Sequence, residues 1–135
     1  MSPFVWNDAY SVNVKRCDEQ HQKLFAIINE LFDAMRVGQA RNALGVIVGQ
    51  LAAYTEIHFR TEEEILRNVK YPSLAIHRDE HHKFEAQVDK FKREIELSGS
   101  TNSIDMLDFL KEWLTKHIRQ VDRQYAAYVN ERGIG

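Results

Sequence analysis

Residues 74–88 read LAIHRDEHHKFEAQV, and this stretch decides the fold class of the 135-residue chain. Apolar side chains and histidines recur in it at steps of three and four residues: Leu74, His77, His81, Phe84 and Val88. Such spacing places them in one row along a helix. The stretch therefore predicts an amphipathic helix whose buried face carries two imidazoles four residues apart.

Three further stripes of the same period flank this one. The first begins near Asp18, a candidate N-cap, and the second ends at Tyr71-Pro72, because the residue before a proline is disfavoured in a helix. Asn102 or Ser103 can cap the last stripe. The stripes predict helices over residues 18–37, 40–68, 73–97 and 103–130. Short connections favour antiparallel neighbours, so we expect an all-α, up-down-up-down four-helix bundle in a single domain, 1–135, with an extended N-terminal arm over 1–17.

The composition excludes several classes of function. The chain has 18 Lys and Arg against 20 Asp and Glu, and no basic run longer than Lys15-Arg16, which argues against nucleic acid binding. No apolar stretch approaches the ~20 residues of a membrane-spanning helix, so we expect no membrane insertion. A lone cysteine, Cys17, and a start without a basic and an apolar region favour a cytoplasmic location.

Histidines and carboxylates interrupt the apolar row of every predicted helix: His21, His58, Glu62, His77, His81, His117 and Asp122. The last is geometrically the weakest, since five residues at 100° each set Asp122 ~140° from His117. A single inward histidine is usually a hydrogen-bonded core residue. Seven such groups in one small core need a neutralising charge, which a buried cation supplies. Imidazole and carboxylate ligands indicate iron, manganese or zinc rather than calcium.

The number of donors indicates two ions, because one first-row ion accepts at most about six. If Glu62 and Asp122 each bridge the pair, the five histidines divide into three and two. A bridging solvent oxygen then completes six donors on one ion and five on the other. One position remains open, and a small molecule can bind there.

Four runs of sequence resemble the hemerythrin family, and in particular its bacterial members, over nearly the whole chain. They are Asp18-Glu-Gln-His21, His58-Phe-Arg-Thr-Glu62, Tyr71-Pro72 with His77-x-x-x-His81, and Trp113-Leu-Thr-Lys-His117-Ile-Arg-Gln-Val-Asp122. The resemblance implies two iron ions with an oxo or hydroxo bridge. It implies that one iron is held by His77, His81 and His117 and the other by His21 and His58, with Glu62 and Asp122 bridging.

The resemblance also implies a function without catalysis: reversible dioxygen binding for oxygen carriage, storage or delivery. Five residues match the oxygen pocket of the family: Leu24, Phe59, Trp113, Leu114 and Ile118. Each of them also suits plain core packing, and both roles are compatible. Dioxygen is the expected partner, while the sequence leaves a protein partner and the oligomeric state open.

Three other functions match part of the sequence. A sensor of oxygen, redox state or nitric oxide remains an alternative, although carriage is favoured if the chain is complete. A ferritin-like di-iron oxidase or peroxidase is disfavoured because no Glu-x-x-His occurs. The run His77-Arg-Asp-Glu-His81 matches the His-x-x-Glu-His of some zinc peptidases, but its inward histidines argue against that. His82, Glu63 and Glu64 are expected to face solvent.

Overall fold

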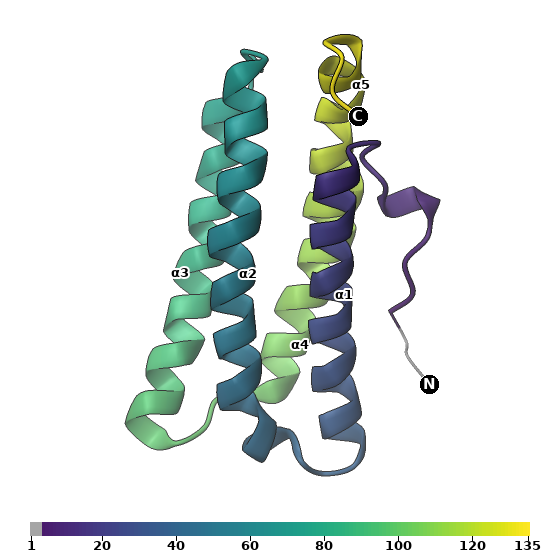
Figure 1. Ribbon diagram of the computed structural model, residues 1–135. Helices are drawn as coiled ribbons and strands as arrows, with labels where there is room; N and C mark the ends of the chain where they lie inside the picture. Colours follow the sequence, from purple (N-terminus) through teal and green to yellow (C-terminus); the bar gives the residue numbers. More distant parts are fainter. Residues whose placement is uncertain (1–3) are drawn as a thin grey trace.

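A computed structural model describes residues 4–135, apart from the side chain of Gln120, and shows four helical columns side by side (Figure 1). The columns alternate in direction, which confirms the predicted all-α antiparallel bundle. The first three are α1 (Lys15–Arg36), α2 (Ala40–Asn68) and α3 (Leu74–Ser98). The fourth consists of α4 (Ser103–Glu112), η2 (Trp113–Asp122) and α5 (Arg123–Glu131).

The first helix begins three residues before the predicted start, because Asp18 is not its N-cap. Val14 occupies the cap position and offers no side-chain hydrogen bond. The Asp18 carboxylate instead accepts hydrogen bonds from the Ser11 hydroxyl (2.6 Å) and the Val12 amide (2.9 Å). Asp18 therefore fastens the preceding segment to the first turn of α1.

The N-terminal arm lies along α1, and residues 1–3 of the predicted arm lie outside the described residues. The arm includes the short helix η1 (Asp8–Tyr10). The Asn29 side chain accepts from the Phe4 amide (3.1 Å) and donates to the Phe4 carbonyl (2.8 Å). Trp6 and Tyr10 pack edge-on against Phe25 at centroid distances of 5.4 and 4.8 Å. The arm thus covers one side of α1.

The middle of the fourth column is a π-helix, η2, with α-helices before and after it. A π-helix bonds residue i to i+5, which widens the turn to roughly 4.4 residues and reduces the rotation to roughly 82° per residue. Five residues then bring Asp122 within roughly 50° of His117, instead of the ~140° of an α-helix. This widened turn explains how both side chains reach the same interior region.

Two apolar clusters fill the bundle, and a layer of polar side chains separates them. The larger cluster includes Leu24, Phe59 and Ile118, and the smaller includes Cys17, Leu66 and Tyr125. On α1, His21 falls between Cys17 and Leu24, and the same order of apolar, polar and apolar positions recurs on α2 and along η2 and α5. In the described part of the chain, no helix is long and apolar enough to cross a bilayer.

Candidate metal centre

All seven predicted donors lie in the layer between the two clusters, which we call the polar layer: His21, His58, Glu62, His77, His81, His117 and Asp122. α1 contributes one side chain, and α2, α3 and η2 contribute two each. Every one is at most 3% exposed. The rows of apolar residues around them aim these side chains inward, because the larger apolar surface must be buried.

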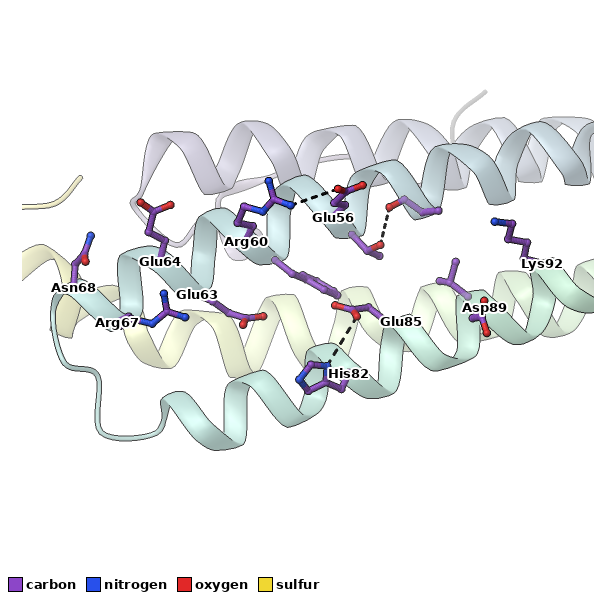
Figure 2. Close-up of a pocket in the computed structure, with 14 residues that line it drawn as sticks. Glu56, Arg60, Glu63, Glu64, Arg67, Asn68, His82, Glu85, Asp89 and Lys92 are labelled. Atoms are coloured by element: carbon purple, nitrogen blue, oxygen red, sulfur yellow. Dashed lines mark hydrogen bonds and ion pairs between the residues drawn. The ribbon is translucent and has the colours of Figure 1, made fainter.

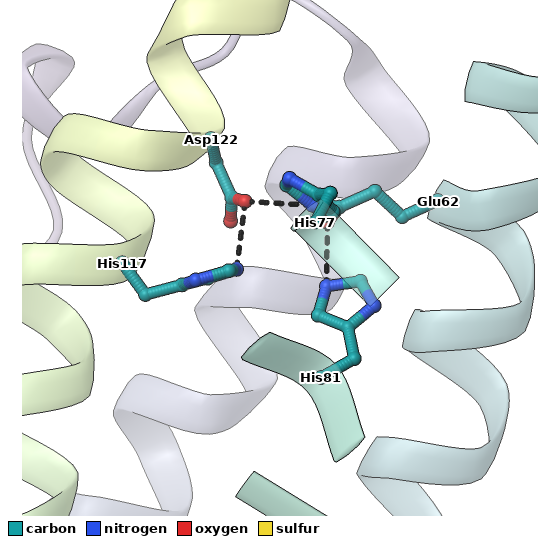
Figure 3. Close-up of side chains that lie close together, drawn as sticks. All are labelled: Glu62, His77, His81, His117 and Asp122. Atoms are coloured by element: carbon teal, nitrogen blue, oxygen red, sulfur yellow. Dashed lines mark hydrogen bonds and ion pairs between the residues drawn. The ribbon is translucent and has the colours of Figure 1, made fainter. Parts of the chain in front are cut away.

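The polar layer contains two groups of side chains. Within each group, the donor atoms all lie within 4.8 Å of one another. Figure 3 shows the first group, His77, His81 and His117 with both carboxylates. The second group contains His21 and His58 with the same two carboxylates. Glu62 and Asp122 therefore belong to both groups, as the donor count predicts for two bridged ions.

Each carboxylate presents one oxygen to each group. Oε1 of Glu62 lies 3.0 Å from Nε2 of His81, while its Oε2 lies 3.1 Å from Nε2 of His58. Oδ1 of Asp122 lies 2.9 Å from Nε2 of His117, while its Oδ2 lies 3.2 Å from Nε2 of His21. His77 contacts Oε1 of Glu62 and Oδ1 of Asp122 through its Nε2. This is the arrangement that two bridging carboxylates require.

The orientation of these atoms fits a metal better than a hydrogen-bonded network. Both oxygens of Asp122 and both ring nitrogens of His117 are buried and make no hydrogen bond of acceptable geometry. Nε2 of His117 nevertheless lies only 2.9 Å from Oδ1 of Asp122. The Nε2 atoms of His21 and His58 face each other at 2.9 Å. Buried polar atoms are normally paired, so lone pairs that converge on a common point indicate that a cation belongs there.

Without a cation, protons must balance the buried carboxylates, and the pKa values reflect this. Burial opposes protonation of His21 and His77, but Asp122 and Glu62 outweigh it and raise the pKa of His21 to about 9 and of His77 to about 10. For His58, burial prevails and lowers the pKa. The histidines around Glu62 and Asp122 lower the pKa of both carboxyl groups despite burial. Both acids thus stay ionised and available to bridge.

The Nδ1 atoms of the imidazoles, which point away from the two carboxylates, have different partners. Nδ1 of His81 donates to Glu63 at 2.8 Å, and Nδ1 of His117 lies 3.5 Å from Glu80. Nδ1 of His58 donates to the amide oxygen of Gln20 at 2.6 Å, and Gln20 in turn donates to Thr61. Such contacts fix the orientation and tautomer of a ligating imidazole.

The prediction that Glu63 faces solvent is wrong. Its side chain is 16% exposed, because Arg78 and His81 of α3 hold its two oxygens at 3.2 and 2.8 Å. Figure 2 shows it among the charged residues that line an open groove of about 770 Å³ between α2 and α3. His82, on the same groove, is exposed as predicted.

A buried tyrosine also contacts the polar layer. The Tyr125 hydroxyl donates to Oε2 of Glu62 at 2.9 Å, and the side chain is fully buried. Burial and the charge of Glu62 raise the pKa of Tyr125 well above its usual value, so the phenol remains a donor. The spacing of the sequence gives no sign that the Tyr125 hydroxyl contacts a carboxylate of the polar layer.

The five residues of the predicted oxygen pocket are all buried in the larger apolar cluster: Leu24, Phe59, Trp113, Leu114 and Ile118. Two of them stack face to face on imidazoles of the polar layer. Phe59 lies over His81 at a centroid distance of 3.8 Å, and Trp113 lies over His117 at 3.7 Å. A third aromatic residue, Tyr54, stacks on His58 at 5.2 Å. Aromatic and aliphatic side chains thus cover this side of the polar layer.

Comparisons with known proteins agree on one family. The model of the hemerythrin HHE cation binding domain matches residues 12–129. A bacteriohemerythrin of Clostridium acetobutylicum is 33% identical, covering 90% of this chain and 98% of the relative. A hemerythrin-like protein of Naegleria gruberi is 30% identical, covering 92% of each chain. The crystal structure of a wild-type hemerythrin superposes with a TM-score of 0.84 at 27% identity, covering 94% of this chain and 98% of the other.

Proposed function

The chain belongs to the hemerythrin family, and on that premise we propose that its polar layer holds two iron ions that bind dioxygen reversibly. His77, His81 and His117 would hold one iron, and His21 and His58 the other. Glu62 and Asp122 would bridge the pair together with an oxo or hydroxo group. When bound, the two irons supply the two electrons that reversible dioxygen binding uses.

One observation carries this proposal: both carboxylates are shared between the two histidine groups, one oxygen to each. With the carboxylates and a solvent bridge shared, the group of three histidines offers six donors and the group of two offers five. The ion with fewer donors is therefore the one that can accept a small molecule. A site of one ion would not explain why two carboxylates lie between two sets of imidazoles.

The surrounding side chains favour binding and release over further reaction. Phe59 and Trp113 cover His81 and His117, and Leu24, Leu114 and Ile118 are at most 1% exposed. This apolar wall excludes water and protons, which would otherwise make the binding of dioxygen irreversible. Most of the proposed ligands are neutral imidazoles. Anionic ligands stabilise high oxidation states of iron, and the protein supplies only two of them here. We therefore infer that the protein carries or stores dioxygen and is not an oxidase.

Metal analysis together with an absorption spectrum of the air-exposed protein tests the proposal. We expect two irons per chain, a charge-transfer band of an oxo bridge, and spectral changes that reverse when oxygen is removed from the reduced protein and returned. One zinc per chain with no visible absorption would contradict the assignment. Hydroxylation of added hydrocarbons by the iron-loaded protein would contradict the absence of oxidase activity.

A further inference from the structure

Two buried polar atoms beside the polar layer have no hydrogen-bond partner: the Tyr54 hydroxyl oxygen and the Trp113 indole nitrogen. Tyr54 is 6% exposed and Trp113 is 9% exposed, and the two polar atoms themselves are shielded from solvent. A buried donor without a partner destabilises a fold, so native proteins contain few of them. These two require an explanation that the packing of their rings does not provide.

Both residues adjoin ligand imidazoles, one in each histidine group. The Tyr54 ring lies nearly parallel to His58, with an interplanar angle of 15°, and the Trp113 ring nearly parallel to His117, at 11°. Phe59 lies between them, 6.2 Å from Tyr54 and 5.8 Å from Trp113 by centroid distance. Both rings therefore pack in the apolar cluster that forms the wall of the proposed oxygen pocket.

The two groups also lie close to each other. Both rings pack against Phe84, Tyr54 at a centroid distance of 6.5 Å and Trp113 at 4.5 Å. No hydrogen bond joins the Tyr54 hydroxyl to the indole nitrogen. A phenol O–H can donate, and an indole N–H can only donate. Together they present two donors to the same small region.

We propose that Tyr54 and Trp113 form a hydrogen-bonding subsite for the outer atom of a small acceptor ligand held beside the iron of His21 and His58. Dioxygen and small anions such as azide share the lone pairs that such a subsite recognises. The inference rests on the proposed function, because a ligand must first find an open position on that iron. Tyr54 then acts as a specificity-determining residue that favours ligands with an acceptor at their outer end.

Two other tyrosines of the chain show why the Tyr54 hydroxyl is unusual. The Tyr125 hydroxyl donates to Glu62, and the Tyr128 hydroxyl donates to the carbonyl of Lys70 at 3.0 Å. Both hydroxyl groups thus satisfy a protein acceptor. A phenylalanine at position 54 would provide the same stacking on His58 without a buried unpaired hydroxyl. The hydroxyl is accounted for if it pairs with a group that enters the pocket.

Azide titration of the oxidised, iron-loaded full chain tests the inference by visible absorption. We expect Tyr54→Phe to bind azide about tenfold more weakly than the unmodified protein, because one hydrogen bond to the anion is lost. The iron content should stay the same, since Tyr54 contributes no metal donor. Tyr128→Phe is the matched control: it removes a hydroxyl outside the polar layer and should leave azide affinity unchanged.

Two further measurements do not depend on affinity. In the unmodified protein, the infrared stretching band of bound azide should shift when H2O is replaced by D2O, and Tyr54→Phe should reduce this shift, because the Trp113 indole remains as the second donor. In the metal-free protein, Tyr54→Phe should leave the midpoint of thermal unfolding unchanged or raise it, because no hydrogen bond is lost. Tyr125→Phe should lower that midpoint, because it removes one of the hydrogen bonds to the buried Glu62 carboxylate.

The outcomes separate this inference from the proposed function. Azide affinity that changes less than twofold in Tyr54→Phe, in a protein that holds two irons and binds azide, overturns the subsite and leaves the proposed function standing. An unmodified protein that fails to hold two irons, or that holds them and binds neither azide nor dioxygen, overturns both. An equal loss of affinity in Tyr128→Phe would also overturn the specific role of Tyr54.

Discussion

The two histidine groups of the candidate metal centre offer the same type of donor but differ in what lies behind it. Behind the group of three histidines, the carboxylates of Glu63 and Glu80 contact His81 and His117. Behind the group of two, His58 meets the neutral amide of Gln20, and Nδ1 of His21 has no partner. A carboxylate behind an imidazole makes it a stronger donor than an amide does. We therefore expect the first ion to be held more tightly and the second to remain available for ligand exchange.

Removing a shared carboxylate should abolish both halves at once. We expect Glu62→Ala to reduce the iron content from two to below one per chain and to eliminate the absorption of the bridged pair, because Glu62 contacts both groups. Metal analysis and the visible spectrum measure this. Glu64→Ala, which removes an exposed carboxylate two residues away, is the control. An unchanged spectrum in Glu62→Ala would show that the bridge is misassigned.

The metal-free protein should lose stability as the pH rises. His21 and His77 have pKa values of about 9 and about 10 in the folded state, above the ~6.5 of an unfolded histidine. Their contribution is therefore fully present below pH ~6.5 and is lost as the pH rises through 9 to 10, by on the order of 3 kcal/mol for His21. Urea unfolding of the metal-free chain between pH 6 and 10 measures the loss. Stability that increases over that range would contradict these pKa values.

Metal uptake should reverse this dependence. Ligating imidazoles must be deprotonated, so binding of iron near pH 7 releases protons from His21 and His77, and a weakly buffered titration should detect them. The iron-loaded chain should then lose stability at low pH, where protons compete with the metal for the same nitrogens. Metal uptake without proton release would show that these histidines are neutral before binding.

Changing the outer contacts should alter the difference between the halves without removing a ligand. We expect Glu63→Gln to lower iron affinity by about 10- to 100-fold, because it removes the negative charge behind His81. Gln20→Glu, which places a carboxylate behind His58, should strengthen the second half and make the two ions more alike. Competition with a chelator measures both. Equal affinities in the three proteins would mean that the outer contacts do not set the difference.

The smallest effect is expected on the exposed face of α2, which points away from the polar layer. Arg60 pairs with Glu56 at 3.4 Å, and both side chains are more than 70% exposed. Exposed pairs of this spacing contribute about 0.3 to 0.5 kcal/mol, so Arg60→Ala should change stability by no more than that. It should not alter iron content. Denaturant unfolding of the iron-loaded chain would check this, and a loss of iron would show an unforeseen link between the groove and the centre.

The periodicity of the sequence was sufficient to predict the bundle and the inward position of six of the seven candidate donors, whereas Asp122 reaches the interior only through the π-helical turn of η2. The pattern identifies them because a helix that packs in a core needs an apolar face, and a histidine or acid in that row is an exception, as at His117 between Leu114 and Val121. The start of α1 was predicted too late, since Asp18 resembles an N-cap but bonds back to Ser11 and Val12. A local pattern cannot distinguish these two uses of the same carboxylate.

The outer contacts were not predictable from spacing. Glu63 follows Glu62 and is rotated ~100° from it on the helix, which suggests an exposed position. Its partners, Arg78 and His81, lie 15 and 18 residues further along the chain, on the neighbouring helix. Tyr54 likewise reads as an ordinary core aromatic residue, and only the three-dimensional structure shows that its hydroxyl is unpaired. Contacts of this kind depend on how neighbouring helices are rotated about their axes.

The π-helical turn of η2 makes the length of this segment as important as its composition. Deleting one residue between His117 and Asp122 would leave an i, i+4 spacing, which an ordinary α-helix places on one face, while an insertion would rotate Asp122 away from the interior. The separation of five residues is therefore tied to the widened turn. A search for related chains that assumes uniform α-helical spacing would misalign the aspartate. A design that places these two side chains on a straight α-helix should separate them by four residues instead.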